Sequence, residues 1–236
     1  NLAVADDPVL VAAQGGINFY IGNNETSDGV SAIMAEPLGH NWRLADVTYI
    51  AERDVGTTLK PGEVSAYWRN RGARWIFDHP LAFFKLTLKR LWFSIADIEI
   101  ANNRLMSTLT NQIGLLRYNP LRFGIIFVLA AIGTAACWHS TPTVRWLVVG
   151  MLILTTTNAL FFVNSRFRLP LIPLYITLGG LALDQIVRSH RVIWRRGAVL
   201  SAAIIAAALT WYPMYSLPRG LTSQDLLSKG LMLYNR

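Results

Sequence analysis

Two arginines in the segment 164–173, Asn-Ser-Arg-Phe-Arg-Leu-Pro-Leu-Ile-Pro, are the side chains best suited to chemistry. Arg166 and Arg168 lie at the boundary between two apolar runs. A guanidinium group binds phosphate through two parallel hydrogen bonds and does not lose its charge. The two side chains are therefore suited to binding the phosphate of a lipid-linked donor at a membrane surface. The alternative is that both side chains only anchor helix ends by extending toward the lipid head groups.

A second group of polar side chains lies in the segment 15–24, Gly-Gly-Ile-Asn-Phe-Tyr-Ile-Gly-Asn-Asn. Its glycines and asparagines are typical of turns. We expect Asn18, Tyr20, Asn23 and Asn24 to lie on a loop that contacts a sugar or lipid, because exposed loops commonly carry binding residues.

The acidic residues and histidines do not define a catalytic or metal site. Asp6 and Asp7 resemble a carboxylate pair, but neighbouring acids before Pro8 are typical of a solvated turn. No residue is assigned as catalytic, and no cofactor is expected. The acids of the amino-terminal segment leave room for a divalent cation. Scattered histidines do not have the clustered arrangement of metal ligands; they are His40, His79, His139 and His190.

The composition predicts a membrane protein. Of the 236 residues, 53% are hydrophobic and only 15% are charged, which is unusual for a soluble domain. The net charge of +8 is placed beside apolar runs rather than on one polar face, which argues against nucleic-acid binding. The single cysteine, Cys137, excludes a disulfide within the chain.

Apolar runs predict about four membrane-spanning helices, because about 20 residues are needed to cross the hydrocarbon. The predicted spans are 123–138, 146–163, 169–187 and 197–215. The loop 188–196 carries four arginines in nine residues, which indicates the cytoplasmic side. The 164–168 loop, the amino-terminal segment and the carboxy-terminal tail are then extracytoplasmic.

Outside the spans, three further regions are expected. Residues 1–80 form an extracytoplasmic loop domain of α/β type, with a helical pattern after Pro61 that ends near Pro80. The region 81–120 holds an amphipathic helix, 81–98, that lies at the membrane interface or packs on the loop domain's own core. The tail 216–236 has the spacing of the start of a helical repeat. The fold class is thus mainly α and integral to the membrane.

The segments 164–173 and 15–24, with the later Gly29, resemble the carboxy-terminal half of bacterial GT-C glycosyltransferases, the relatives of protein mannosyltransferases and of the lipid A aminoarabinose transferase. The resemblance implies a multi-pass enzyme of the bacterial inner membrane. It implies that a sugar passes from a polyprenyl-phosphate donor to a lipid, glycan or protein acceptor on the extracytoplasmic side.

One departure from this family concerns the catalytic acid. Members carry it in an outward loop after their first span, and no such span precedes Asn1, so we expect a fragment that lacks the catalytic base. Two other classes stay open. A transporter or flippase-like protein would show helices broken in matching halves, whereas Gly179-Gly180 is a single break. A scaffold that recruits partners would tolerate replacement of the 15–24 segment.

Overall fold

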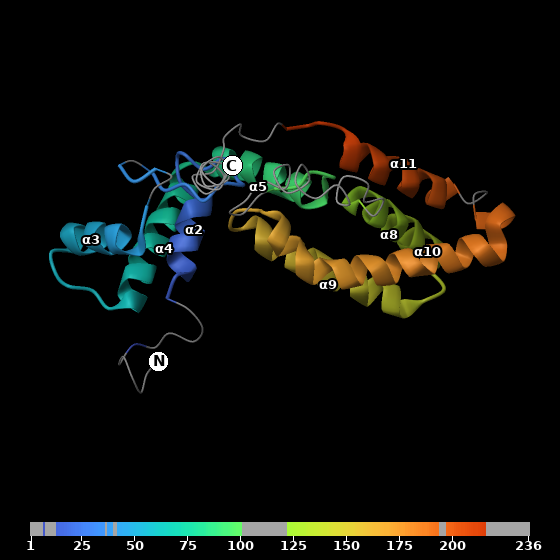
Figure 1. Ribbon diagram of the computed structural model, residues 1–236, viewed down its shortest axis with the longest axis horizontal. Coiled ribbons are helices and arrows are strands. Elements are labelled where there is room, and N and C mark those ends of the chain that lie inside the picture. The colour runs from blue at the N-terminus through green and yellow to red at the C-terminus, as the bar shows by residue number, and fades with distance from the viewer. Residues whose placement is uncertain are drawn as a thin grey trace, which may run out of the picture. The chain divides into compact units, whose positions relative to one another are not determined.

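The computed structural model describes residues 7, 13–35, 37–39, 42–100, 122–193 and 197–215, with the backbone alone for 189–193. The described chain is mainly helical (Figure 1). It divides into two compact units. Unit 1 comprises residues 1–90 and 157–163, and unit 2 comprises 91–156 and 164–236. The predicted tail, 216–236, lies outside the described residues.

Unit 1 is built from α2 (Gly15–Gly22), α3 (Leu44–Val55), α4 (Pro61–Asp78) and most of α5 (Pro80–Ile95). Local signals set the helix boundaries. The α3 helix begins where the Asp46 carboxylate accepts a hydrogen bond from the Arg43 amide, and it ends at Gly56, whose φ of 84° is left-handed. Pro61 starts α4, since proline is well tolerated in the first helical turn.

The helix α2 occupies the segment where the sequence predicted a loop. Its glycines do not form a turn but let the backbone of α2 pack closely against other segments of unit 1. A Cβ at Gly16 would lie 1.7 Å from the Ser65 carbonyl oxygen of α4, and one at Gly22 would lie 2.4 Å from that of Phe161. The prediction of an α/β-type domain is wrong for the described residues, which form helices and one isolated bridge between Met34 and Gly39.

The helical predictions after residue 60 are confirmed. The α4 helix ends at Asp78 and α5 begins at Pro80, where a break was expected. Val64 and Trp68 lie one turn apart on α4 and are buried. The Trp68 indole donates to the Val47 carbonyl, 3.1 Å away, which links α4 to α3.

Unit 2 contains α8 (Phe123–Cys137), most of α9 (Pro142–Ala159), the 3-10 helix η1 (Ser165–Leu171), α10 (Ile172–Ile193) and α11 (Gly197–Trp211). The tight contact is between α8 and α10. A Cβ at Gly133 would lie 1.9 Å from the Leu178 carbonyl oxygen, so only glycine allows this approach. Small residues on both helices complete the contact, among them Ala130, Ala136 and Ala182.

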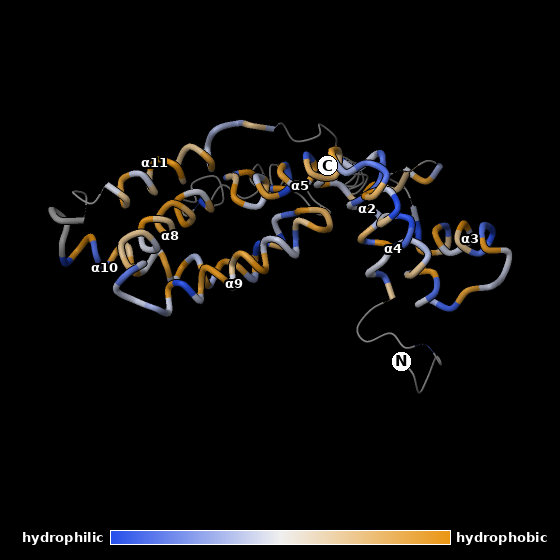
Figure 2. The backbone as a smooth tube through the Cα atoms, turned by 180° about the vertical axis from the view of Figure 1, so that it is seen from behind, coloured by the Kyte–Doolittle hydropathy of each residue, from blue (hydrophilic) through white to orange (hydrophobic). Residues whose placement is uncertain are grey.

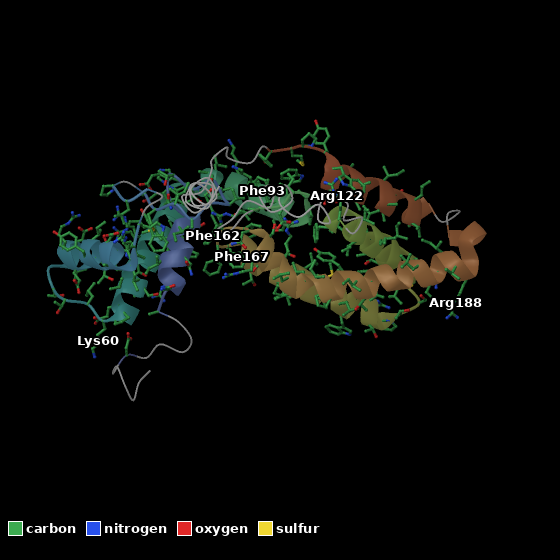
Figure 3. The ribbon with its side chains drawn as sticks, viewed as in Figure 1. Lys60, Phe93, Arg122, Phe162, Phe167 and Arg188 are labelled. Atoms are coloured by element: carbon green, nitrogen blue, oxygen red, sulfur yellow. The ribbon has the colours of Figure 1, made fainter. Side chains whose placement is uncertain are left out.

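Contacts along the helices show their directions. Near the start of α8, the Phe123 ring lies 5.6 Å from the Tyr175 ring near the start of α10, and Gly133 further along meets Ala182. These helices therefore run parallel. Gly124 meets Thr210 at the end of α11, so α11 runs antiparallel to α8. Figure 3 labels Arg122 and Arg188, which lie near opposite ends of these helices.

Large apolar side chains cover much of the outside of unit 2. They include Trp146, Leu152, Ile153, Ile176, Leu183, Ile204 and Ile205. Figure 2 shows the hydrophobic colours along α8 and α9, whereas α4 and the loops of unit 1 carry many hydrophilic residues.

One helix in the described part of the chain, Ser165–Arg188, is long and apolar enough to cross a membrane. The helices α8 and α11 are apolar but have 15 residues each, fewer than the predicted spans. At 1.5 Å per residue they extend about 22 Å, which is less than the ~30 Å of hydrocarbon. Asp184 pairs with Arg188, one turn further along α10, at 2.6 Å.

Candidate functional site

The short helix η1 positions both arginines of the 164–173 segment. It begins at Asn164, a buried N-cap residue whose side-chain oxygen accepts a hydrogen bond from the Phe167 amide, 3.2 Å away. Pro170 lies inside the helix, and α10 continues from Ile172. A 3-10 helix has three residues per turn, so Arg166 and Arg168 point in different directions.

Arg168 is 4% exposed and is bound to the protein itself. Its guanidinium donates to the Ala96 carbonyl, 2.9 Å away, to the Ile98 carbonyl, and to the Ser165 hydroxyl, 2.9 Å away. The guanidinium carbon also lies 4.6 Å from the centre of the Phe123 ring. The Nε atom of Arg168 is buried and has no hydrogen-bond partner among the described residues. A direct contact of Arg168 with phosphate stays a prediction, and it would require this arrangement to open.

Arg166 is exposed and lies over the ring of its neighbour Phe167, with 5.9 Å from the guanidinium carbon to the ring centre. Within the described part of the chain, no hydrogen bond or ion pair engages its guanidinium. The two arginines of the segment therefore differ. Arg168 holds the backbone in place, and Arg166 offers a full set of donors to an anion.

The segment 96–100 is the surface on which η1 rests. The Ser165 amide donates to the Ile100 carbonyl at 3.1 Å, and the Ile100 amide donates to the Ser165 hydroxyl at 2.8 Å. Asp97 extends this network to α8 and α11. Its carboxylate accepts from the Gly124 amide and the Trp211 indole, 3.1 and 3.0 Å away, and pairs with Arg122 at 2.9 Å.

The polar residues predicted for the 15–24 segment lie in unit 1 and are largely buried. The Asn23 amide nitrogen donates to the carbonyls of Phe19 and Leu160, each 2.8 Å away. That of Asn24 donates to the Tyr20 carbonyl at 2.9 Å, and its oxygen accepts from the Thr26 hydroxyl at 2.7 Å. These two asparagines therefore close the end of α2. Their contact with a sugar or lipid stays a prediction.

The other two residues of that prediction are placed differently. Tyr20 is 2% exposed and packs on Trp68, with 4.8 Å between ring centres. Burial raises the pKa of Tyr20 to about 12, so its hydroxyl is neutral at physiological pH. Asn18 is half-buried on α2.

Arg90 performs in unit 1 the task that Arg168 performs in unit 2. It is fully buried and donates to the Gly22 carbonyl, to the Asn23 side-chain oxygen at 3.2 Å and to the Ala159 carbonyl at 3.0 Å. Two of these acceptors lie at helix ends, which carry partial negative charge. Burial lowers the pKa of Arg90 to about 10, against the opposing effect of Asp28, so the group stays charged at neutral pH.

Two of the acids, Asp7 and Asp28, accept hydrogen bonds from nearby backbone amides. The Asp7 carboxylate is buried rather than solvated, and it accepts from the Gly62 amide, 2.7 Å away, in the first turn of α4. Asp28 accepts from the Val30 and Ser31 amides at 2.9 and 2.7 Å. Within the described ranges, His, Cys, Asp and Glu side chains form no group of three that could hold a metal ion.

Two central residues, Arg90 and Asp97, were not identified as site residues from the sequence. In the sequence, Arg90 is one of three cations in the middle of α5, with Lys85 and Lys89. A lone arginine among aromatic residues, in Lys-Arg-Leu-Trp-Phe, gives a weak signal of a buried cation. Its partners come from residues 22–23 and 159, so the site needs the tertiary fold.

Comparisons of the chain with models of known protein families, with curated proteins and with solved structures gave no match.

Proposed function

We propose that this chain is part of a membrane glycosyltransferase that uses a polyprenyl-phosphate sugar, and that Arg166 binds the phosphate. The observation that carries the proposal is the exposed Arg166 guanidinium, which has no hydrogen-bond or ion-pair partner among the described residues and lies at the start of a helix held by hydrogen bonds. Charge-assisted bonds between guanidinium and phosphate are strong and directional, so one fixed arginine can orient a phosphate group.

The anchoring of η1 supports this role. Arg168 is a positioning residue that binds the carbonyls of Ala96 and Ile98, and the Asn164 cap holds the first turn. Side chains locked in this way keep a neighbouring binding group in place, which lowers the entropic cost of binding.

The apolar exterior of unit 2 supports a lipid environment. Leu152, Ile153 and Ile204 are exposed, and α8 and α11 contain no charged residue. A phosphate carried on a polyprenyl chain needs an apolar surface for the chain beside a cationic group for the head. The sugar would be transferred to a lipid, glycan or protein acceptor, and the general base belongs to a residue that is not assigned in this chain.

A direct test measures binding of a polyprenyl phosphate to the chain in lipid nanodiscs. Arg166→Gln should weaken binding at least tenfold, since a hydrogen bond to a charged group contributes about 1.5–3 kcal/mol. The matched control is Arg145→Gln, which removes the same charge from an exposed residue at the start of α9. Equal affinities for wild type and Arg166→Gln, or an equal loss in the control, would contradict the phosphate role.

Transfer kinetics of the full-length protein separate binding from catalysis. Arg166→Gln should raise the KM for the donor with little change in kcat, whereas Arg168→Gln should lower the stability as well. Absence of sugar transfer from any polyprenyl-phosphate donor, with phosphate binding intact, would refute the enzymatic part of the proposal.

A further inference from the structure

Unit 1 contains an open pocket between α3 and α4 that is separate from the arginines of unit 2. Its volume is about 480 Å³, which is within the ~300–1,000 Å³ range of small-molecule sites. Helix α4 supplies four of its lining residues at positions i, i+3, i+4 and i+7, so they share one face. These four residues are Tyr67, Asn70, Arg71 and Arg74. Asp54, in the last turn of α3, completes the lining.

Three of these residues are already held in a hydrogen-bond network. The Tyr67 hydroxyl donates to the Asp54 carboxylate at 2.5 Å and accepts from Arg71 at 3.3 Å. Arg71 is 3.9 Å from Asp54, at the limit of an ion pair. The second carboxylate oxygen accepts from Arg53, with a distance of 2.8 Å. Asp54 is therefore neutralised mainly by Arg53, and the charge of Arg71 is incompletely compensated.

Aromatic rings orient Arg71. Its guanidinium carbon lies 5.6 Å from the centre of the Tyr20 ring and 5.5 Å from that of Trp68. Both rings are 2% exposed and belong to the core, so Arg71 rests on a well-packed surface. A smaller cavity of about 120 Å³, with Leu38 and Ile50 in its wall, shares Asp54 and Arg71 with the pocket.

Two further lining groups are available to a ligand. Arg74 and Asn70 are exposed, and within the described residues their side chains make no hydrogen bond or ion pair. With Arg71 and Arg74 against Asp54, the lining has a net charge of +1. The pocket thus combines two guanidinium groups with an amide, a phenol and a carboxylate.

We propose that this pocket binds a sugar that carries a negatively charged group, either a carboxylate or a phosphate. Arg71 and Arg74 bind the anion, because the planar fork of donors on a guanidinium group matches two oxygens of a carboxylate or a phosphate. Asp54 and Asn70 bind sugar hydroxyls, since both supply hydrogen-bond acceptors beside the charged end. This binding is independent of the donor site proposed for Arg166.

Isothermal titration calorimetry on the whole chain in nanodiscs tests this inference. The probes are glucuronic acid, glucose 6-phosphate, uncharged glucose and inorganic phosphate. At least one of the two acidic sugars should bind at least about tenfold more tightly than glucose and than inorganic phosphate. The comparison of the two acidic sugars identifies which anion the pocket prefers.

Arg74→Gln should weaken binding of the preferred acidic sugar at least about fivefold. This residue is exposed, so the variant should fold, and circular dichroism checks that it does. The matched control is Arg69→Gln, an exposed arginine on the same helix that does not line the pocket. Binding should be unchanged in this control.

Three results would overturn the assignment. They are an equal loss of affinity in Arg74→Gln and Arg69→Gln, equal affinities for glucose and both acidic sugars, and inorganic phosphate binding as tightly as the preferred acidic sugar. Absence of binding by both acidic sugars at about 10 mM would also overturn it. None of these results bears on polyprenyl-phosphate binding at Arg166, so failure of the two proposals can be distinguished.

Discussion

Both units expose large apolar side chains, among them Phe77 and Leu81 in unit 1 and Leu152 and Ile204 in unit 2, but they differ in the side chains at their central helix contacts. Tyr20 and Trp68 are 2% exposed in unit 1. In unit 2 the helix contact is made by Gly133 and small neighbours, while Leu152 and Ile204 are 61% and 60% exposed. Burial of large apolar groups stabilises a fold in water, but in lipid it adds little, and close packing of small residues dominates. The small-residue contact of unit 2 is of the kind that packs helices in lipid, so we expect this unit to lie in a membrane.

Despite this contrast, each unit buries one arginine against backbone carbonyls. Arg90 and Arg168 are 0% and 4% exposed, and each binds two carbonyl groups and one side-chain oxygen. In both units a buried arginine thus satisfies backbone carbonyl groups. Buried carbonyls need hydrogen-bond donors whether the surroundings are water or lipid. The burial of an arginine therefore carries no information about the solvent outside.

The strongest test of this shared device removes each arginine. Arg90→Gln and Arg168→Gln should each lower the free energy of unfolding by about 2–4 kcal/mol, because two buried carbonyls lose their donors at about 1–3 kcal/mol each. Denaturant titration in mixed micelles measures the change. Lys85→Gln and Arg166→Gln are the controls, since both residues are exposed, and they should change stability by less than about 0.5 kcal/mol. An unchanged free energy of unfolding in Arg90→Gln would show that the two buried arginines do not contribute equally to stability.

The glycine contacts give the next largest effect. Gly16→Ala in unit 1 and Gly133→Ala in unit 2 should each cost about 2–3 kcal/mol, because the added Cβ would meet a backbone oxygen at 1.7 and 1.9 Å. Gly15→Ala and Gly180→Ala are matched helical controls with no atom within 4 Å of the added Cβ. They should be neutral or stabilise by about 0.4–1 kcal/mol. Similar unfolding midpoints for Gly16→Ala and Gly15→Ala would contradict the packing of α2 on α4.

Labelling with a water-soluble maleimide tests the difference in surroundings. Tyr49 in unit 1 is 64% exposed and Ile204 in unit 2 is 60% exposed, so the protein itself covers them equally. In a Cys137→Ser background, Tyr49→Cys should react at least about tenfold faster than Ile204→Cys in membranes, since the reaction needs a solvated thiolate. Detergent removal of the lipid followed by denaturation should equalise the rates. Equal rates in intact membranes would place both units in water.

The smallest effect concerns the surface charges of unit 1. The Tyr67 hydroxyl, and after it Arg53, hold the pKa of Asp54 below its ordinary value. This stabilisation is present above the unfolded-state pKa of about 3.9 and is lost as the pH falls through the folded-state value. Tyr67→Phe should therefore move the Asp54 titration, followed by carboxyl NMR shifts, to higher pH. An unchanged titration would show that the hydrogen bond does not persist in solution.

Much of the helical architecture could be predicted from apolar runs and helix boundaries. The break before Pro80, the stripe through Val64 and Trp68, and the helices that begin near residues 123 and 197 follow from local rules. The α2 helix could not be predicted in this way, because glycine and asparagine favour turns in isolation. Its stability comes from contacts with residues 65 and 161, which are distant in the sequence.

At the candidate site, Arg166 and Arg168 also separate what the sequence predicts from what the tertiary structure decides. By itself, the sequence determined that two permanent cations stand at the end of an apolar run, since charge and hydropathy are properties of the residues. Only the tertiary structure decided that Arg168 lies inside, on the carbonyls of Ala96 and Ile98, and that Arg166 lies outside. The physical reason is that burial of a cation depends on acceptors supplied from elsewhere in the chain, and a linear pattern does not contain them.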